Sequence, residues 1–219
     1  MNRIENVVFD LDGTLIDSSE GVVAAVNYSL EQMGEPHQSP ELIKAYIGYP
    51  LSAMYPNFTD KPLDELYRHF QVKAAETVIS STVALPGVEK AIRLLYEQGY
   101  RLAIATTKVK RHLDGILSLL NWQDFFVVGV GGDEVDRVKP DPEAFQLTLT
   151  RMKADPRTTL VVGDTENDVL AAKAVPLPVA AIRSPYGDDI RLRATDPDYF
   201  LDHISELPDL IARLNGGDR

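Results

Sequence analysis

Short apolar runs alternate with helix-like patterns along most of this chain. Each apolar run has the length of a strand and ends at polar residues, and the segments between the runs carry apolar positions at three- and four-residue steps. The predicted strands are residues 7–9, 102–105, 125–130, 159–162, 179–182 and a weaker run at 199–200. Strands that alternate with helices in this way predict an α/β fold, with a Rossmann-like parallel sheet core and helices on both faces.

One long segment contains helical patterns only. After Asp17 the pattern is helical as far as residue 82, and Ser18 or Ser19 is placed to cap the first helix. The predicted helices are 19–33, 40–48 and 63–79 in this segment and 88–99, 111–120, 143–152, 166–174 and 204–214 in the rest of the chain. We therefore predict a core domain of residues 1–17 and 83–219, with an all-helical domain of residues 18–82 inserted into it.

The first predicted strand ends in two aspartates. Asp10 and Asp12 are two positions apart, so in an extended chain their side chains point to the same side, about 6–7 Å apart at the base. Neighbouring carboxylates beside an apolar strand repel each other unless one is protonated or a cation lies between them. A hard divalent cation such as Mg2+ suits this pair. The alternative is an ordinary turn at a strand end, since Asp and the following Gly13 are both common in turns.

Polar residues also follow the later strands. Parallel strands present their carboxyl ends at one edge of the sheet, where open α/β sheets bind ligands. The polar residues expected there, besides Asp10 and Asp12, are Thr106, Thr107, Lys139, Asp164 and Asp168. Carboxylates could hold Mg2+, and a threonine hydroxyl and a lysine ammonium could bind a phosphoryl group. Taken singly, each residue could cap a helix or lie in solvent, but together they supply what one phosphoryl site needs.

Composition restricts the class of protein. Of the 219 residues 44% are hydrophobic, and 22 Lys and Arg against 33 Asp and Glu give a net charge of −11. This charge argues against a nucleic-acid or anionic-membrane surface, and the lack of cysteine excludes thiolate metal sites and cysteine nucleophiles. No signal peptide or membrane span is evident, so we expect a cytoplasmic protein. The four histidines, His37, His69, His112 and His203, lack metal-ligand spacing and are expected at the surface.

Four segments together resemble the motifs of the haloacid dehalogenase superfamily. They are Asp10-Leu11-Asp12-Gly13-Thr14-Leu15, the strand end at Thr106, Lys139-Pro140-Asp141-Pro142, and Gly163-Asp164-Thr165-Glu166-Asn167-Asp168. The helical insertion after the first motif resembles the cap domain of the phosphoglycolate phosphatase and β-phosphoglucomutase branch. Within it, residues 47–51 (Ile-Gly-Tyr-Pro-Leu) resemble the Gly-x-Pro-Leu stretch of phosphoglycolate phosphatases.

The resemblance implies catalytic roles for four residues. Asp10 would attack phosphorus in line and form an aspartyl-phosphate. Asp12 would protonate the leaving oxygen and then take a proton from the water that hydrolyses this intermediate. Thr106 and Lys139 would hold the transferring phosphoryl group.

The resemblance also implies a metal and a substrate site. Mg2+ would be bound by the carboxylates of Asp10 and Asp164 and by the main-chain carbonyl of Asp12, with Asp168 near it. We assign substrate binding to Thr107, Lys108, Gly48 and Tyr49.

The function that the resemblance favours is a Mg2+-dependent phosphatase of a small phosphorylated metabolite, similar to phosphoglycolate phosphatase. Asp12 separates this reaction from dehalogenation, which needs no acid for a leaving oxygen. The alternatives are a phosphomutase of the β-phosphoglucomutase type, a pyrophosphatase or nucleotidase of the same superfamily, and a phospho-acceptor receiver domain. We expect no nucleic-acid or membrane partner, and either a monomer or a homodimer.

Overall fold

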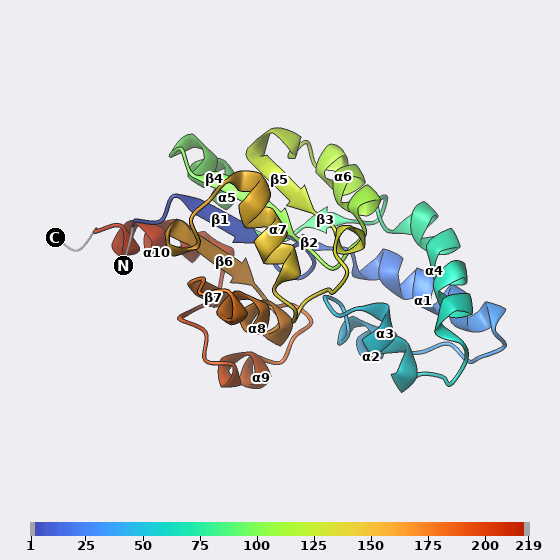
Figure 1. The fold of residues 1–219 in the computed structure, drawn as a ribbon. Coiled ribbons are helices and arrows are strands. Elements are labelled where there is room, and N and C mark those ends of the chain that lie inside the picture. The colour runs from blue at the N-terminus through green and yellow to red at the C-terminus, as the bar shows by residue number, and fades with distance from the viewer. Residues whose placement is uncertain (1–2, 217–219) are drawn as a thin grey trace.

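A computed structural model describes residues 3–216 of the chain. Its centre is a six-stranded sheet with the strand order β5-β4-β1-β6-β7-β8 (Figure 1). The strands are β1 Asn6–Phe9, β4 Arg101–Ala105, β5 Phe126–Val130, β6 Thr159–Gly163, β7 Val179–Ile182 and β8 Tyr199–Leu201. Every neighbouring pair in this sheet is parallel, which confirms the predicted α/β architecture.

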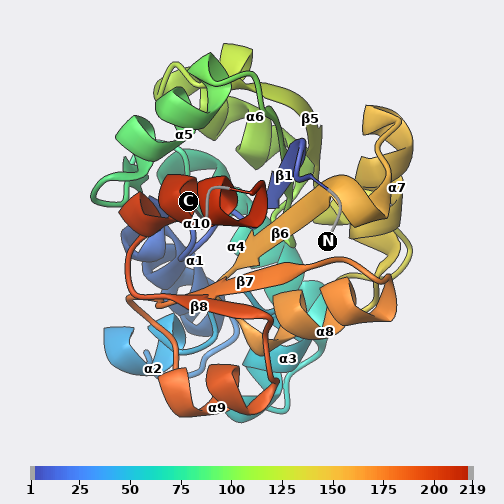
Figure 2. The same cartoon turned by 90° about the vertical axis from the view of Figure 1, so that its left-hand side faces the viewer.

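Helices cover both faces of the sheet (Figure 2). Side chains alternate along β1, so Val7 and Phe9 belong to the hydrophobic cluster on one face and Val8 to the cluster on the other. The helices that pack on the sheet in the first cluster are α5 Val88–Glu97, α6 Lys110–Leu119 and α10 Leu207–Leu214, and this cluster continues into the helices of residues 19–77. The helices of the second cluster are α7 Glu143–Met152, α8 Glu166–Ala174 and α9 Asp189–Ala194. Among the helices of residues 3–216, none combines the length and apolar character needed to span a membrane.

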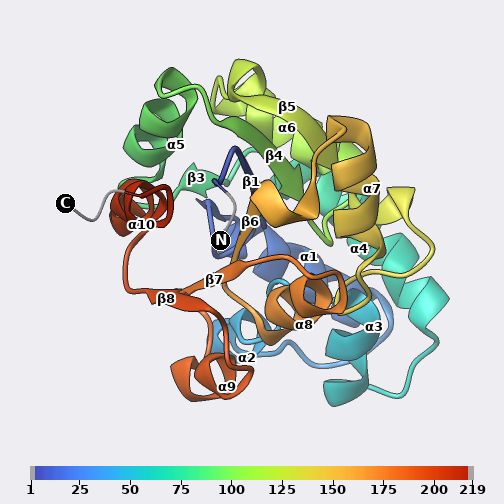
Figure 3. The same ribbon diagram turned by 60° about the vertical axis from the view of Figure 1, so that its left-hand side comes forward.

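The segment between β2 Ile16–Asp17 and β3 Val83–Ala84 is helical, as predicted. It contains α1 Ser19–Gln32, α2 Pro40–Lys44, α3 Leu51–Met54 and α4 Leu63–Thr77, which lie beyond the carboxyl ends of the strands (Figure 1, Figure 3). β2 and β3 form an antiparallel ladder of two residues each, so both connections between the sheet and the helical segment run side by side. The division of the chain into two domains at this ladder stays a prediction.

Several helices differ from the predicted ones. α2 ends at Lys44 instead of reaching Gly48, because residues 45–49 form turns and Gly48 has a φ of 90°. The predicted helix 204–214 begins with a 3-10 turn, and α10 starts only at Leu207, with Pro208 in the first turn where no N–H is needed. α3 and α9 were not predicted. Both are short, and the Asp188 carboxylate caps α9.

We predict that Asn215→Ala destabilises the protein. The Asn215 side chain accepts a hydrogen bond of 2.6 Å from the Ile4 N–H and donates one of 3.0 Å to the Ile4 carbonyl. Because Ile4 is buried, the variant leaves two main-chain groups unpaired, at a cost of about 2 kcal/mol. At this chain length Tm should fall by about 4–8 °C in a thermal melt. Arg213→Ala, at an exposed position of the same helix, is the control, and an equal fall in both variants would contradict the prediction.

Candidate active site

Three central strands bring the predicted site residues together. β4, β1 and β6 are parallel neighbours, so their carboxyl ends lie at one edge of the sheet. Asp10 follows β1, Thr106 follows β4 and Asp164 follows β6, and these side chains belong to residues that are 2%, 1% and 3% exposed. The strand order therefore buries the three residues at one place, as the sequence predicts.

Lys139 completes this group from a loop. Its ammonium lies 2.5 Å from Asp10 Oδ1 and 2.5 Å from Asp168 Oδ1, and it donates a hydrogen bond of 3.1 Å to the Ala105 carbonyl. Lys139 and Asp168 are both buried, so the alternatives of a solvated loop charge and an exposed helix-end acid are wrong. One carboxylate oxygen each from Asp10, Asp164 and Asp168 lies within 4.8 Å of the others.

Burial and neighbouring charges shift the pKa values of Asp10, Asp164 and Lys139. Burial, opposed by the Lys139 ammonium, raises the pKa of Asp10 to about 7. Burial, together with the charges of Asp10 and Asp168, also raises the pKa of Asp164. For Lys139 burial opposes the charged form, but Asp10 and Asp168 outweigh it and raise the pKa of the lysine. Three carboxyl groups thus surround one ammonium, and full ionisation would leave two negative charges without a partner.

These residues fit a divalent cation. Asp10 Oδ2 is buried and has no hydrogen-bond partner within the part of the chain that the structure describes. Such an oxygen costs free energy unless a proton or a cation binds it. Gly13, with a φ of 86°, borders the same place, and a Cβ there would collide with the Asp164 carboxylate. Mg2+ prefers carboxylate oxygens and carries the two charges that are missing, so Asp10, Asp164 and Asp168 could hold it.

Two threonines orient two of the carboxylates. Thr14 Oγ1 donates a hydrogen bond of 2.7 Å to Asp164 Oδ1. The N–H and hydroxyl of Thr165 both donate to Asp168 Oδ2, at 3.1 and 2.6 Å. Neither threonine was predicted to contribute to the site. The spacing of Thr165 and Asp168 is that of a capping box and could have indicated their contact, whereas Thr14 gives no such signal.

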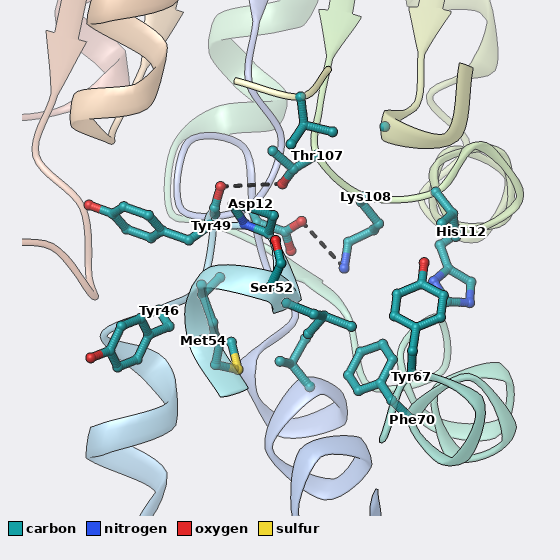
Figure 4. A pocket seen from close by; sticks show the side chains of 18 of the residues that line it. Asp12, Tyr46, Tyr49, Ser52, Met54, Tyr67, Phe70, Thr107, Lys108 and His112 are labelled. Carbon is teal, nitrogen blue, oxygen red and sulfur yellow. Dashed lines mark hydrogen bonds and ion pairs between the residues drawn. The ribbon is translucent and has the colours of Figure 1, made fainter. Parts of the chain in front are cut away.

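Asp12 forms a second buried pair. Its Oδ2 lies 3.3 Å from the Lys108 ammonium, as Figure 4 shows, and its Oδ1 accepts a hydrogen bond from the Ser18 hydroxyl. Ser18 therefore does not cap α1 with its side chain, contrary to the prediction. The Asp12 carboxylate is also absent from the cluster of Asp10, Asp164 and Asp168 among the described residues, so only its main-chain carbonyl is left for the predicted metal contact.

The turn before α3 reaches the edge of the sheet. Thr107 Oγ1 donates a hydrogen bond of 3.3 Å to the Gly48 carbonyl (Figure 4). The Tyr49 hydroxyl donates to the Glu166 carboxylate. Gly48 is required here because its φ is 90° and a Cβ would lie 2.9 Å from the Thr165 methyl group. These two hydrogen bonds hold the helical segment over the candidate site.

A pocket of about 350 Å³ lies between the sheet edge and the helical segment (Figure 4). It is lined by Asp12 and by all four residues predicted to bind the substrate, Thr107, Lys108, Gly48 and Tyr49. The structure therefore gathers these residues around one cavity, and their contact with a substrate stays a prediction.

His112 also lines this pocket, and its predicted place at the surface is wrong. The residue is 5% exposed, because it lies on the buried side of α6. Burial and the nearby charges of Lys108 and Arg111 lower the pKa of His112 to about 4, so the ring is neutral near pH 7. Its Nε2 has no hydrogen-bond partner within residues 3–216.

Comparison with known proteins gives one family. The family described as haloacid dehalogenase-like hydrolase matches residues 7–182. The chain is 33% identical over 208 residues to IndB of Dickeya dadantii, which is named a probable phosphatase. The alignment covers 92% of this chain and 90% of IndB. The chain is 30% identical to the pyrophosphatase PpaX of Bacillus mycoides, with 98% of this chain and 100% of PpaX covered.

Solved structures agree with this result. The crystal structure of a predicted phosphoglycolate phosphatase from Haemophilus somnus superimposes with a TM-score of 0.85 at 25% sequence identity. The match covers 96% of this chain and 99% of that one.

We predict that replacing Asp10 removes a pH-dependent loss of stability from the metal-free protein. The pKa of Asp10 is about 7 in the folded state against an ordinary value of 3.8, so the folded state binds this proton more tightly than the unfolded state. The contribution of Asp10 to the free energy of unfolding therefore falls as the pH rises from 3.8 through about 7. In thermal melts with EDTA, the stability of Asp10→Asn relative to wild type should rise over this range, by at most ~1.4 kcal/mol per pH unit. A difference that stays constant would contradict the assignment.

We predict that Mg2+ stabilises the protein through the buried carboxylates. At ~100 times its Kd, a ligand that binds only the folded state adds about 2.7 kcal/mol, or roughly 5–10 °C in Tm at this length. Asp164→Asn should lose most of this shift. Asp196→Asn, at an exposed position outside the site, should keep it. An equal shift in both variants would mean that Mg2+ binds elsewhere.

Proposed function

The chain belongs to the haloacid dehalogenase-like hydrolase family, and we propose that it is a Mg2+-dependent phosphatase that cleaves a small phosphomonoester through an aspartyl-phosphate at Asp10. Phosphatase activity itself follows from the family and from relatives that are named phosphatase and pyrophosphatase. The metal, the covalent route and the ester substrate are what we propose.

One observation carries this proposal. Asp10 is a buried carboxylate, and Lys139 holds one of its oxygens while the other has no hydrogen-bond partner among residues 3–216. It lies beside Asp164 and Asp168 and two residues from Asp12. A structural ion pair needs only Asp10 and Lys139. The additional acids are expected where a dianionic phosphoryl group and a divalent cation must be accommodated together.

In the first proposed step Asp10 acts as the nucleophile. One carboxylate oxygen of Asp10 forms a bond to phosphorus while the bond from phosphorus to the ester oxygen breaks. Asp12 transfers a proton to that departing oxygen, so an alcohol leaves and not an alkoxide. The contacts of Asp12 with Lys108 and Ser18 hold its carboxyl group in place for this transfer.

In the second proposed step water restores the carboxylate. Asp12, now deprotonated, takes a proton from water, which bonds to phosphorus as the bond from phosphorus to the Asp10 oxygen breaks. The products are inorganic phosphate and free Asp10. Lys139 and the Thr106 hydroxyl hold the phosphoryl oxygens in both steps, and bound Mg2+ would supply the charge that makes phosphorus susceptible to attack.

The helical segment is proposed to act as a cap. The contacts of Gly48 and Tyr49 with Thr107 and Glu166 fasten it over the pocket, where it would exclude bulk water during the first step. The ladder of β2 and β3 is the expected hinge, because both connections pass through it.

Pyrophosphate is the second candidate substrate. The Bacillus relative that spans the whole of this chain is named a pyrophosphatase. The chemistry at Asp10 would be the same, with phosphate as the leaving group instead of an alcohol.

We predict that phosphate release requires both Asp10 and Mg2+. With a panel of phosphomonoesters and pyrophosphate, Asp10→Asn should lower kcat by at least ~10^4-fold, because the nucleophile is removed, and EDTA should abolish turnover. Asp12→Asn should lower kcat by about 10²–10⁴-fold, the usual worth of general acid–base catalysis. Asp196→Asn serves as the control and should retain wild-type turnover. Activity that survives in Asp10→Asn would rule out the covalent route.

A further inference from the structure

The pocket beside Asp12 changes its character from one side to the other. At the sheet edge it is polar, with Asp12, Thr107 and Lys108. On the side of the helical segment its lining is mostly apolar and aromatic, with Val22, Met54, Leu63, Tyr67, Phe70 and Tyr46, and contains the polar residues Ser52 and Gln71. Figure 4 shows Tyr67, Phe70 and His112 at one side of the pocket, with Asp12 and Lys108 between them and Tyr49. A leaving group bound here meets rings and hydrocarbon.

The pocket offers little free positive charge to a second anionic group of a substrate. Two acids, Asp12 and Asp133, and two bases, Lys108 and Arg111, line it. Lys108 lies against Asp12, and Lys139 lies between Asp10 and Asp168, so neither ammonium is free. The remaining base, Arg111, is exposed. A carboxylate or a second phosphate bound deep in this pocket would compete with Asp12 for Lys108 or depend on the exposed Arg111, so an uncharged group is favoured there.

The size of the pocket points in the same direction. Its volume is about 350 Å³. An apolar cavity of about 150 Å³ suffices for a benzene ring, so there is room for a ring with substituents or for two rings. A two-carbon acid or a phosphate ion would leave most of the apolar lining without contact.

His112 adds a polar requirement. Its neutral imidazole is buried at the pocket, and its Nε2 has no partner within the described residues. Buried polar atoms in folded proteins are nearly always hydrogen-bonded, so an unpaired one that lines a cavity is a candidate for contact with a ligand. The neutral imidazole can donate a hydrogen bond to a polar group of the ligand or accept one from it.

We propose that the preferred substrate is the phosphate ester of an uncharged, ring-containing alcohol, whose ring system stacks on Tyr67 and Phe70 and carries a polar group that hydrogen-bonds to His112. The proposal rests on the phosphatase function proposed above, and it names the substrate class of the same site. It assigns His112, Tyr67 and Phe70 to leaving-group recognition. It also disfavours phosphoglycolate and pyrophosphate, whose leaving groups are small and anionic.

The first test compares two kinds of substrate on the wild-type protein with Mg2+. Uridine 5′-monophosphate and 1-naphthyl phosphate represent ring-containing esters, and 2-phosphoglycolate and pyrophosphate represent small anionic leaving groups. We expect kcat/KM to be at least ~10-fold higher for the ring esters, the equivalent of about 1.4 kcal/mol. If either small anionic substrate is the better one, the inference is overturned while the proposed function stands. If no compound releases phosphate, both are overturned.

The second test concerns His112. His112→Leu should raise KM for uridine 5′-monophosphate relative to 1-naphthyl phosphate by about 10-fold, because uridine offers polar groups and the naphthyl ring system offers none. His112→Asn retains a hydrogen-bonding side chain and should restore part of the preference. His69→Leu, a histidine of α4 outside the pocket lining, is the matched control. An unchanged KM ratio in folded His112→Leu would overturn the role of His112.

A third measurement does not depend on the folding of any variant. Uridine is expected to inhibit the wild-type enzyme competitively, whereas glycolate at the same concentration is expected to have no effect. Inhibition by glycolate and not by uridine would overturn the assignment of the apolar side of the pocket to the leaving group.

Discussion

The balance of buried charge at the end of β1 is the constraint on which the rest of the site depends. Asp10, Asp164 and Asp168 lie with Lys139 in a place that is almost without solvent, where an unpaired ion costs several kcal/mol. One ammonium cannot balance three carboxylates. The fold therefore carries a cluster that is complete only with protons or a cation, and this incompleteness is what a catalytic site needs and a purely structural ion pair does not.

The two aspartates of the first motif have different surroundings, although they are only two residues apart. The carboxyl group of Asp10 belongs to the cluster around Lys139, and that of Asp12 pairs with Lys108 and Ser18. Separation of this kind allows one carboxylate to act on phosphorus while the other exchanges a proton at the pocket. The different partners of the two carboxylates separate them, because an extended strand alone would leave both on the same side.

The sequence was sufficient for those features that depend on local pattern. Periodicity predicts the strands of the six-stranded sheet and the helices α7 and α8. The geometry of parallel sheets predicts that the strand-end residues Asp10, Thr106 and Asp164 lie together. The sequence was not sufficient where tertiary contacts determine the burial of a side chain or the end of a helix.

His112 illustrates this limit. It lies on the buried face of α6. No spacing rule reveals that its Nε2 has no hydrogen-bond partner within the part of the chain that the structure describes. Likewise, residues 45–49 continue the helical pattern of α2, but a glycine with positive φ and contacts across to Thr107 turn the chain instead.

The ladder of β2 and β3 has a consequence for how this molecule can change over evolution. The segment between the two strands is, for the sheet, one long loop whose ends are held together by two residue pairs. The entropy of closing such a loop grows only with the logarithm of its length, so that doubling it costs only about 0.6 kcal/mol. Insertions, deletions or exchange of helices in this segment are therefore cheap for the sheet, and substrate preference can diverge while Asp10 and its partners stay where they are.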